Sequence, residues 1–350
     1  MPMTTPSLEN AFIDGLAARL PRSPLQLNRC HESDAELLRL PGSDFVLALT
    51  TDGVVEEIET GLYRDPYLVG WMTVVVNASD LAAVGADPIG ILLSQTFATD
   101  HDQAFVERLQ QGVEAAATAC KLPVLGGDVN YAIRTQMVGC ALGLVADGQP
   151  LRRRGCAVGD LLFATHRLGA GTAFALTQLE ADRTGSRSTV DYRPLARLAE
   201  GQHLRRFATS CMDTSDGVLA TLAQLGELNS VGFEFHQPVS EVVSANARLI
   251  AEAAQIPPWM LLAGPHGEFE LLFTIPPGRR EEFLTAASDQ EWLPLELGRV
   301  MPSPGVRLQA DGAREALDGG EVRNLFLEVR GDVERYIAEL MRIHERLSLS

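Results

Sequence analysis

Five short segments, far apart in this chain, each place one or two aspartates among small residues. They read SDA at 33–35, TTDG at 50–53, NASDLAAVGA at 77–86, GGD at 126–128 and DTSDG at 213–217. Carboxylates that a fold brings together repel one another, and a divalent cation relieves that repulsion. Ligand sets made only of oxygen select hard ions such as Mg²⁺, which often carry substrate phosphates. The segments therefore predict a Mg²⁺–nucleotide enzyme.

Each segment also has a simpler interpretation on its own. An aspartate beside glycine after a strand is commonly a turn or a helix cap. Asn77 and Asp80 stand three apart and would share one helix face, where a buried aspartate needs a partner. Asp216-Gly217 fits a helix start whose N–H groups face an anion. The metal hypothesis holds only if the segments meet in space.

Composition limits the class of protein. The 350 residues suffice for two ordinary domains, and 46% hydrophobic with 21% charged residues is typical of a soluble globular protein. The net charge of −17 argues against nucleic acid and against an anionic membrane surface as partners. No secretory signal or run of about 20 apolar residues is evident, so a cytoplasmic location is expected.

Cysteine and lysine usage exclude several chemistries. The five cysteines are scattered and form no C-x-x-C pair, which indicates buried free thiols and neither a disulfide framework nor a zinc site. Lys121 is the only lysine and lacks flanking glycines, so a P-loop and the lysine-dependent protein kinase pattern are excluded. Phosphate handling would depend on metals, arginines and backbone N–H groups.

Strands and helices alternate along the chain. Apolar runs predict strands at 44–51, 89–97, 136–145, 160–165, 269–275 and 295–300. Helical spacing and caps such as Asp65-Pro66 predict helices at 65–84, 102–120, 171–181, 218–228, 278–287 and 333–347. Turn residues and arginines at 147–155 predict a solvated linker between two domains, 1–148 and 149–350. The order indicates an α+β or α/β fold.

Six motifs in sequence order resemble thiamine-monophosphate kinase, within the aminoimidazole ribonucleotide (AIR) synthetase or PurM-like superfamily. They are TTD at 50–52, the 77–86 segment, GGD at 126–128, PLRRRG at 150–155 with Gly159-Asp160, DTSDG at 213–217, and ELLF at 270–273. The resemblance implies an N-terminal domain whose sheets pair into a barrel across a homodimer. It also implies a C-terminal α+β domain that covers ATP, with Mg²⁺ in the cleft.

The resemblance also assigns roles to single positions. The metal ligands it implies are Asp34, Thr51, Asp52, Asp80, Asp128 and Asp216. The ATP-binding residues it implies are Thr51, Gly126, Gly127, Asp128 and Arg152, with Asp128 and Asp216 as catalytic residues. The positions assigned to the acceptor substrate are Glu56, Glu59, Asp213, His266 and Glu268. Metal ions would neutralise charge on the transferred phosphoryl group without a covalent intermediate.

The chain departs from the family pattern mainly at the acceptor positions. Ser33 stands where the family has a second aspartate, and Glu59 stands at a histidine position. The family's GGEDYELL is replaced by PHGEFELL at 265–272, which shifts the acidic pair and introduces His266. Since the other metal motifs are intact, binding of Mg-ATP is better supported than thiamine monophosphate as the acceptor.

Two alternatives stay open. One is another ATP-using member of the superfamily, of the cyclo-ligase or dehydratase type; a dehydratase is disfavoured because the chain ends LSLS without a cysteine. Selenophosphate synthetase is disfavoured because Cys30-His31 has no lysine nearby. The other alternative is a nucleotide-binding homodimer that has lost catalysis. A kinase would form ADP and a phosphorylated acceptor, whereas the other enzymes would release ADP and phosphate.

Overall fold

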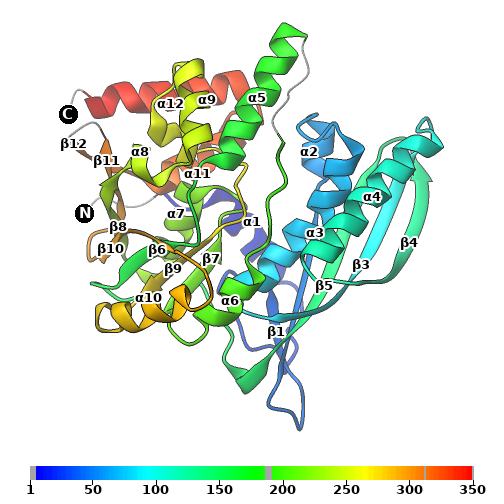
Figure 1. Ribbon diagram of the computed structural model, residues 1–350, viewed down its shortest axis with the longest axis horizontal. Coiled ribbons are helices and arrows are strands. Elements are labelled where there is room, and N and C mark those ends of the chain that lie inside the picture. Colours follow the sequence, from blue (N-terminus) through cyan, green and yellow to red (C-terminus); the bar gives the residue numbers. More distant parts are fainter. Residues whose placement is uncertain (1–4, 186–190, 311–312, 349–350) are drawn as a thin grey trace.

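The computed structural model describes residues 5–185, 191–310 and 313–348, and it contains two sheets with helices around them (Figure 1). The first sheet has the order β1-β2-β5-β3-β4. Its strands are β1 (Glu36–Arg39), β2 (Val46–Gly53), β3 (Asp87–Ala98), β4 (Val124–Ala132) and β5 (Gln136–Val145). Neighbouring strands are antiparallel except β3 and β4, which are parallel and leave β4 at the sheet edge.

Two helices, α3 (Pro66–Ala83) and α4 (Gln103–Ala119), lie on one face of this sheet (Figure 1). Asp65 caps α3 by accepting from the Tyr67 N–H, and Pro66 occupies the first turn. Buried residues surround α3 on all sides, as expected of a helix that is apolar all round. One side of α3 contacts the sheet and α4, and another contacts α6 (Leu198–Leu204) and β7 (Ser210–Asp213).

The opposite face of the first sheet is not covered by any described element (Figure 1). Apolar side chains are exposed on its strands β3 and β4 and in the turn after β4. They are Ile89, Leu92, Val124, Leu125, Val129, Tyr131 and Ile133. Leu92 alternates with the buried Ile91 and Leu93 and so lies on the uncovered face, whereas Val129 and Tyr131 pair with Gln95 and Phe97 on the face that carries α4. Exposed apolar side chains on an edge strand mark a place where another surface docks.

The second sheet has the order β12-β11-β8-β10-β6-β9-β7. Besides β7, its strands are β6 (Leu161–Ala164), β8 (Gly232–Pro238), β9 (Leu271–Ile275), β10 (Leu295–Met301), β11 (Gly305–Ala310) and β12 (Ala313–Leu317). The helices of this half are α5 (Ala170–Thr184), α6, α7 (Val218–Asn229), α8 (Val239–Val242), α9 (Ala245–Ala254), α10 (Arg280–Ser288), α11 (Gly319–Glu328) and α12 (Val333–Ser348). The class is mixed α+β, as predicted.

Short segments complete the chain. Single 3₁₀ turns span Ala146–Gly148, Pro258–Leu262 and Pro277–Arg279. Helix α2 (Val55–Glu59) follows β2 directly, and α1 (Leu8–Ala17) precedes the first sheet. Among the described residues, no helix combines the length and the apolar composition needed to cross a membrane.

The predicted strands and helices are confirmed, with ends that differ by a few residues, but two expectations are wrong. The 147–155 segment is not a solvated linker, because Leu151 is buried and the Arg153 side chain is only 18% exposed. The thiols are not all buried, since Cys30 and Cys140 are half-buried while Cys120, Cys156 and Cys211 are buried. The division into domains at residues 148 and 149 stays a prediction.

Candidate functional site

Three carboxylates from distant parts of the sequence meet between the two sheets. Asp34 precedes β1, Asp80 lies on α3, and Asp213 ends β7. One oxygen of each lies within 4.8 Å of one oxygen of the other two. Three of the five aspartate segments therefore converge, because the buried helix α3 packs against both β2 and β7.

Hydroxyl groups fix the orientation of this acidic cluster, by which we mean Asp34, Asp80 and Asp213. Thr50 on β2 donates a hydrogen bond to Asp80 Oδ2. Ser79 donates to Asp213 Oδ2 at 2.5 Å, and Ser215 donates to Asp213 Oδ1 at 2.8 Å. These donors hold the carboxylate oxygens in place but supply no positive charge.

Arg153 supplies the positive charge at the cluster. Its guanidinium donates to Asp34 Oδ1 at 2.9 Å. The other oxygen of Asp34, and the neighbouring Ser33 Oγ, are sealed from solvent and have no hydrogen-bond partner among the described residues. An unpaired buried carboxylate oxygen is costly and calls for a ligand. One guanidinium cannot balance three carboxylates.

The pKa values of the cluster reflect this excess of acid. Burial, followed by the charges of Asp213, Asp34 and Asp52, raises the pKa of Asp80 well above its usual value. Burial and the charge of Asp34 raise the pKa of Asp213 to about 7. Since like charges and loss of water both disfavour ionisation, a cation placed among the three oxygens would restore it.

A second group of acids borders the cluster. Asn77 holds the backbone of Asp52 by two hydrogen bonds of 3.1 Å, one in each direction. Burial and the charges of Glu56, Asp52 and Asp216 raise the pKa of Glu57 to about 7. Removal from bulk water, followed by the charge of Glu9, raises the pKa of Asp216 to about 6, although part of its side chain stays accessible.

Glu57 was not predicted as a site residue, since the resemblance pointed to Glu56 and Glu59. Glu56 is exposed. Glu59 forms an ion pair with Arg134, from the turn between β4 and β5. The Glu59 side chain therefore points toward Arg134 of the first sheet, and this arginine compensates its negative charge. Glu57 lies near Asp52 because α2 begins two residues after β2 ends, a short connection that the sequence pattern did not indicate.

Two glycines allow the loop at 264–270 to lie directly on the DTSDG segment. A Cβ at Gly217, where φ is +87°, would come within 2.1 Å of the Gly264 carbonyl oxygen. A Cβ at Gly267 would come within 1.4 Å of the Thr214 carbonyl oxygen, and the Gly267 N–H donates to Ser215 O at 2.9 Å. Backbone contact therefore places His266 and Glu268 beside the DTSDG segment. We refer to the 264–270 loop as the cleft wall.

Both of these side chains are buried in the protein. His266 contacts Tyr63 from the first half, with 3.2 Å between Nε2 and the tyrosine Oη, and Tyr192 and Phe174 flank its ring. Burial lowers the pKa of His266 to about 3, so the imidazole is neutral. The assignment of His266 and Glu268 to the acceptor site stays a prediction.

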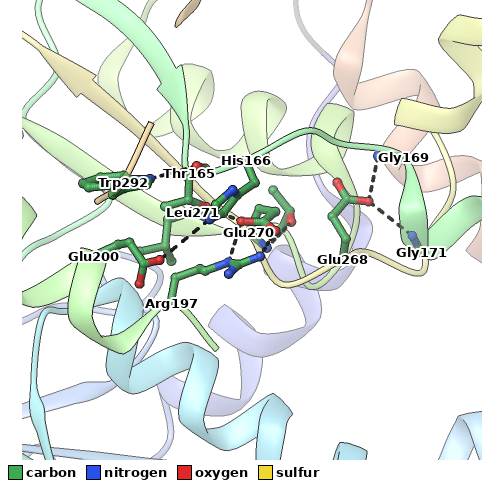
Figure 2. Close-up of polar contacts among 11 residues, drawn as sticks. Thr165, His166, Gly169, Gly171, Arg197, Glu200, Glu268, Glu270, Leu271 and Trp292 are labelled. Carbon is green, nitrogen blue, oxygen red and sulfur yellow. Dashed lines mark hydrogen bonds and ion pairs between the residues drawn. The ribbon is translucent and has the colours of Figure 1, made fainter. Parts of the chain in front are cut away.

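Figure 2 shows how the wall holds its acids. Glu268 accepts from the N–H groups of Gly169 and Gly171, at 3.0 and 3.4 Å, where α5 begins. Glu270 is held by two hydrogen bonds from Arg197, at 2.8 and 2.5 Å. Burial and the charge of Glu270 raise the pKa of Glu268 to about 8.

Some predicted residues lie outside the cluster. Thr51 points to the other side of β2 from Thr50 and donates to Gly139 O at 3.0 Å. Asp128 is exposed within β4, beside Gly126 and Gly127, and accepts from Asn130. Register places Asp128 opposite Ser94 on β3, Ser94 opposite Val138, and Val138 opposite Gly53. Three strand spacings therefore separate Asp128 from the β2 end of the site, about 14 Å.

Arg152 also differs from its predicted place. Its backbone carbonyl accepts from the Cys211 N–H, which ties the segment to β7. Its neighbour Arg153 is the arginine that reaches the cluster. The metal, ATP-binding and catalytic roles of Thr51, Asp128 and Arg152 stay predictions.

Magnesium fits the donor set of the acidic cluster. The ligand atoms are all oxygens, the site carries an excess of negative charge, and Asp34 Oδ2 is buried with no partner among the described residues. Hard divalent ions prefer such ligands, and Mg²⁺ usually completes its coordination with water and phosphate oxygens.

Comparison with known proteins agrees with this geometry. Residues 32–145 match the family model of AIR synthase related protein, N-terminal domain. The thiamine-monophosphate kinase of Escherichia coli K12 is 30% identical over 252 residues, which are 69% of this chain and 75% of that protein. The chain belongs to the thiamine-monophosphate kinase family. The kinase of Aquifex aeolicus is 29% identical over 74% of this chain and 83% of its own length.

Solved structures support the same fold. The structure of AaThiL complexed with AMPPCP and TMP has a TM-score of 0.70 and 25% identity, covering 86% of this chain and 93% of that one. A HypE–HypF complex structure matches with a TM-score of 0.69 at 16% identity, covering 88% of this chain and 99% of that chain. At that identity, the second match supports the fold alone. Members of this kinase family and HypE therefore share the architecture described above.

Proposed function

We propose that this chain is an ATP- and Mg²⁺-dependent phosphotransferase that moves the γ-phosphoryl group of ATP to a small phosphate monoester. Thiamine monophosphate is the first acceptor to test. The observation that carries the proposal is the convergence of Asp34, Asp80 and Asp213 in a site that has one arginine and an unpartnered buried carboxylate oxygen.

In this proposal Asp34, Asp80 and Asp213 hold the metal, with Asp52 and Asp216 beside them. Bound Mg²⁺ would neutralise charge on the phosphates of ATP and on the transferred group. The chain's own part is positioning. Thr50, Ser79 and Ser215 fix the carboxylate oxygens, and Arg153 holds Asp34. A phosphate oxygen of the acceptor attacks the γ-phosphorus, the bond to the β–γ bridging oxygen breaks, and ADP leaves.

We assign the apolar part of the acceptor to a cavity of about 140 Å³ between the segment that follows α2 and the second half of the molecule. The cavity is lined by Thr60–Leu62, by α5, by His266 and by the buried face of α12. Apolar lining with a few polar groups is typical of small-molecule sites. The lining residues Thr60–Leu62 directly follow α2, and Glu57 of α2 is close enough to Asp52 for the Asp52 charge to raise its pKa.

We also propose that two chains associate through the uncovered face of the first sheet. The exposed Leu92 on that face supports this, and so does the free edge of β4 with its exposed apolar side chains. Pairing across such an edge would give the barrel expected of the family. In that arrangement Asp128, which is far from the cluster of its own chain, would belong to a surface shared by two chains.

Product analysis tests the proposal. The purified protein is incubated with ATP, Mg²⁺ and single acceptors, with thiamine monophosphate first and other phosphate monoesters after it. Mass spectrometry should find ADP and phosphorylated acceptor in equal amounts. Formation of ADP with an equal amount of free phosphate, and no phosphorylated acceptor, would instead support the cyclo-ligase or dehydratase type of chemistry.

A further inference from the structure

A second group of metal-binding side chains lies outside the acidic cluster. Asp14 comes from α1, and Cys30 and His31 come from the turn that precedes β1. One ligand atom of each residue lies within 4.8 Å of one atom of the other two, and His31 Nε2 is 3.1 Å from Asp14 Oδ1. The kinase chemistry proposed above uses none of the three.

The distance between His31 and Asp14 is close to what a tetrahedral ion requires. Zinc binds imidazole nitrogen and carboxylate oxygen at about 2.0–2.1 Å, which separates two such ligands by about 3.3 Å. The observed separation of 3.1 Å between His31 and Asp14 needs only a small adjustment. The His31 side chain is 15% exposed, and Asp14 keeps one side toward solvent, which leaves an approach for the ion.

The turn that carries Cys30 and His31 is unusual. Residues 29–32 form a β-turn, closed by the Glu32 N–H donating to Arg29 O at 3.2 Å. The Arg29 N–H donates in return to the Glu32 carboxylate at 2.9 Å. His31, the third residue, has a φ of +65°, a value that favours glycine or asparagine at this position. A histidine there is not explained by turn preference, and its ring contacts Asp14.

We propose that Asp14, Cys30 and His31 form a zinc site with three protein ligands and one open position. A thiolate, an imidazole and a carboxylate are ligands that Zn²⁺ accepts, whereas Mg²⁺ avoids sulfur and nitrogen. The site is thus distinct in metal preference from the oxygen-only acidic cluster. Cysteine spacing gave no sign of it, since Cys30 has no cysteine partner and Asp14 comes from a separate helix.

The site would link the two halves of the molecule. Helix α1 lies near the centre of the molecule (Figure 1) and is attached to the second half. Thr5 donates to Asp318 at 2.8 Å, the Leu8 N–H donates to Asn324 at 3.0 Å, and Asn10 donates to Gln224 at 2.7 Å. The 29–32 turn instead leads into Asp34 and the first sheet. Zinc would therefore fasten α1 to the turn and stabilise the folded chain.

Cobalt substitution tests the proposal on the full chain. Protein freed of metal by a chelator is titrated with Co²⁺ in excess Mg²⁺, so that the acidic cluster is occupied. The expected result is one tightly bound cobalt per chain, with a thiolate-to-cobalt charge-transfer band and tetrahedral visible bands, both displaced by one equivalent of Zn²⁺. Cys30→Ser should abolish the charge-transfer band, and Zn²⁺ should raise the melting temperature of the wild type but not of this variant.

Controls separate the site from other ligands. Cys140→Ser removes the other half-buried thiol and should leave cobalt binding unchanged. Asp14→Asn keeps both turn residues and changes a largely exposed side chain, so it tests the site even if Cys30→Ser misfolds; zinc affinity should fall more than tenfold. The absence of a thiolate band, or equal zinc affinity in wild type, Cys30→Ser and Asp14→Asn, would overturn the proposal. Neither outcome depends on kinase activity.

Discussion

The acidic cluster and the cleft wall both contain buried acids, but the fold treats them differently. On the wall, Glu270 has Arg197 and Thr165 as partners, and Glu268 accepts from the first N–H groups of α5 (Figure 2). In the cluster, three carboxylates share one arginine, and further acids stand around them. The difference indicates that Glu270 is neutralised within the protein by Arg197, whereas the cluster is completed by a ligand from outside. Glu268 is intermediate, because its Oε1, like Asp34 Oδ2, is buried with no hydrogen-bond partner among the described residues. Substitutions in the two regions should therefore have opposite effects on stability and activity.

The largest effect is expected for Asp80→Asn. Loss of this carboxylate should reduce Mg-ATP-dependent turnover by about 10²- to 10³-fold, as for other groups that stabilise transition-state charge. In chelator-treated protein, the same variant should melt at a higher temperature than wild type, because one repelling acid is gone. Steady-state kinetics and thermal melts measure the two effects. Asp87→Asn, an exposed aspartate at the start of β3, is the matched control and should change neither.

A mixing experiment tests whether the cluster is complete in one chain. If Asp128 acts in a site shared between two chains, Asp80→Asn and Asp128→Asn should each be inactive alone. After unfolding and refolding together, they should give activity well above either variant, because mixed dimers contain one intact site. If Asp128→Asn is fully active by itself, Asp128 has no catalytic part. If the mixture stays inactive, each site uses both aspartates of one chain.

On the wall, Arg197→Met should affect stability first. It leaves Glu270, whose side chain is only 6% exposed, without its cation, and breaking such a buried pair costs about 3–5 kcal/mol. Urea unfolding measures the loss, and calorimetry should show that Mg-ATP binding to the folded variant is retained. Arg183→Met breaks the exposed pair with Glu180, which solvent screens, and should change stability little. Equal losses of unfolding free energy in Arg197→Met and Arg183→Met would contradict the burial of Glu270.

A further effect concerns pH. The pKa of Glu268 is about 8 in the folded protein against 4.5 for an ordinary glutamate. Between these values the folded chain keeps a proton that the unfolded chain releases, so this group lowers stability as pH rises from about 5 to 8. Glu268→Gln carries no such titration. Unfolding free energies of variant and wild type should therefore diverge in the variant's favour as pH increases over this range. A constant difference would show that the pKa of Glu268 is ordinary.

The sequence predicted much of the framework because its main elements have strong local signals. The helix from Asp65 has a cap, a proline and a continuous apolar run, and β2, β3 and β5 of the first sheet contain apolar runs. The elements that escaped prediction are short or weakly patterned, such as α1, β8 and the β11–β12 hairpin. Their structure depends on tertiary contacts that local pattern does not reveal.

The site was predictable to the extent that its residues lie on well-defined elements. Asp80 and Asp213 meet because α3 packs against β7. The motifs indicated both residues, but they assigned Asp80 to the metal and Asp213 to the acceptor. The choice between neighbours could not be made from sequence. Thr50 rather than Thr51 contacts Asp80 because alternate strand residues face opposite sides, and Arg153 rather than Arg152 reaches Asp34 because the 150–155 segment is packed and not solvated. Register and packing decide such cases.

The most direct test of the central claim is calorimetric titration of ATP into wild type and Asp80→Asn, with and without Mg²⁺. The acidic cluster should make ATP binding to wild type strictly dependent on Mg²⁺, and Asp80→Asn should weaken that binding by about a hundredfold while the fold stays intact. ATP binding that is equally tight without Mg²⁺, or unchanged in Asp80→Asn, would contradict the account.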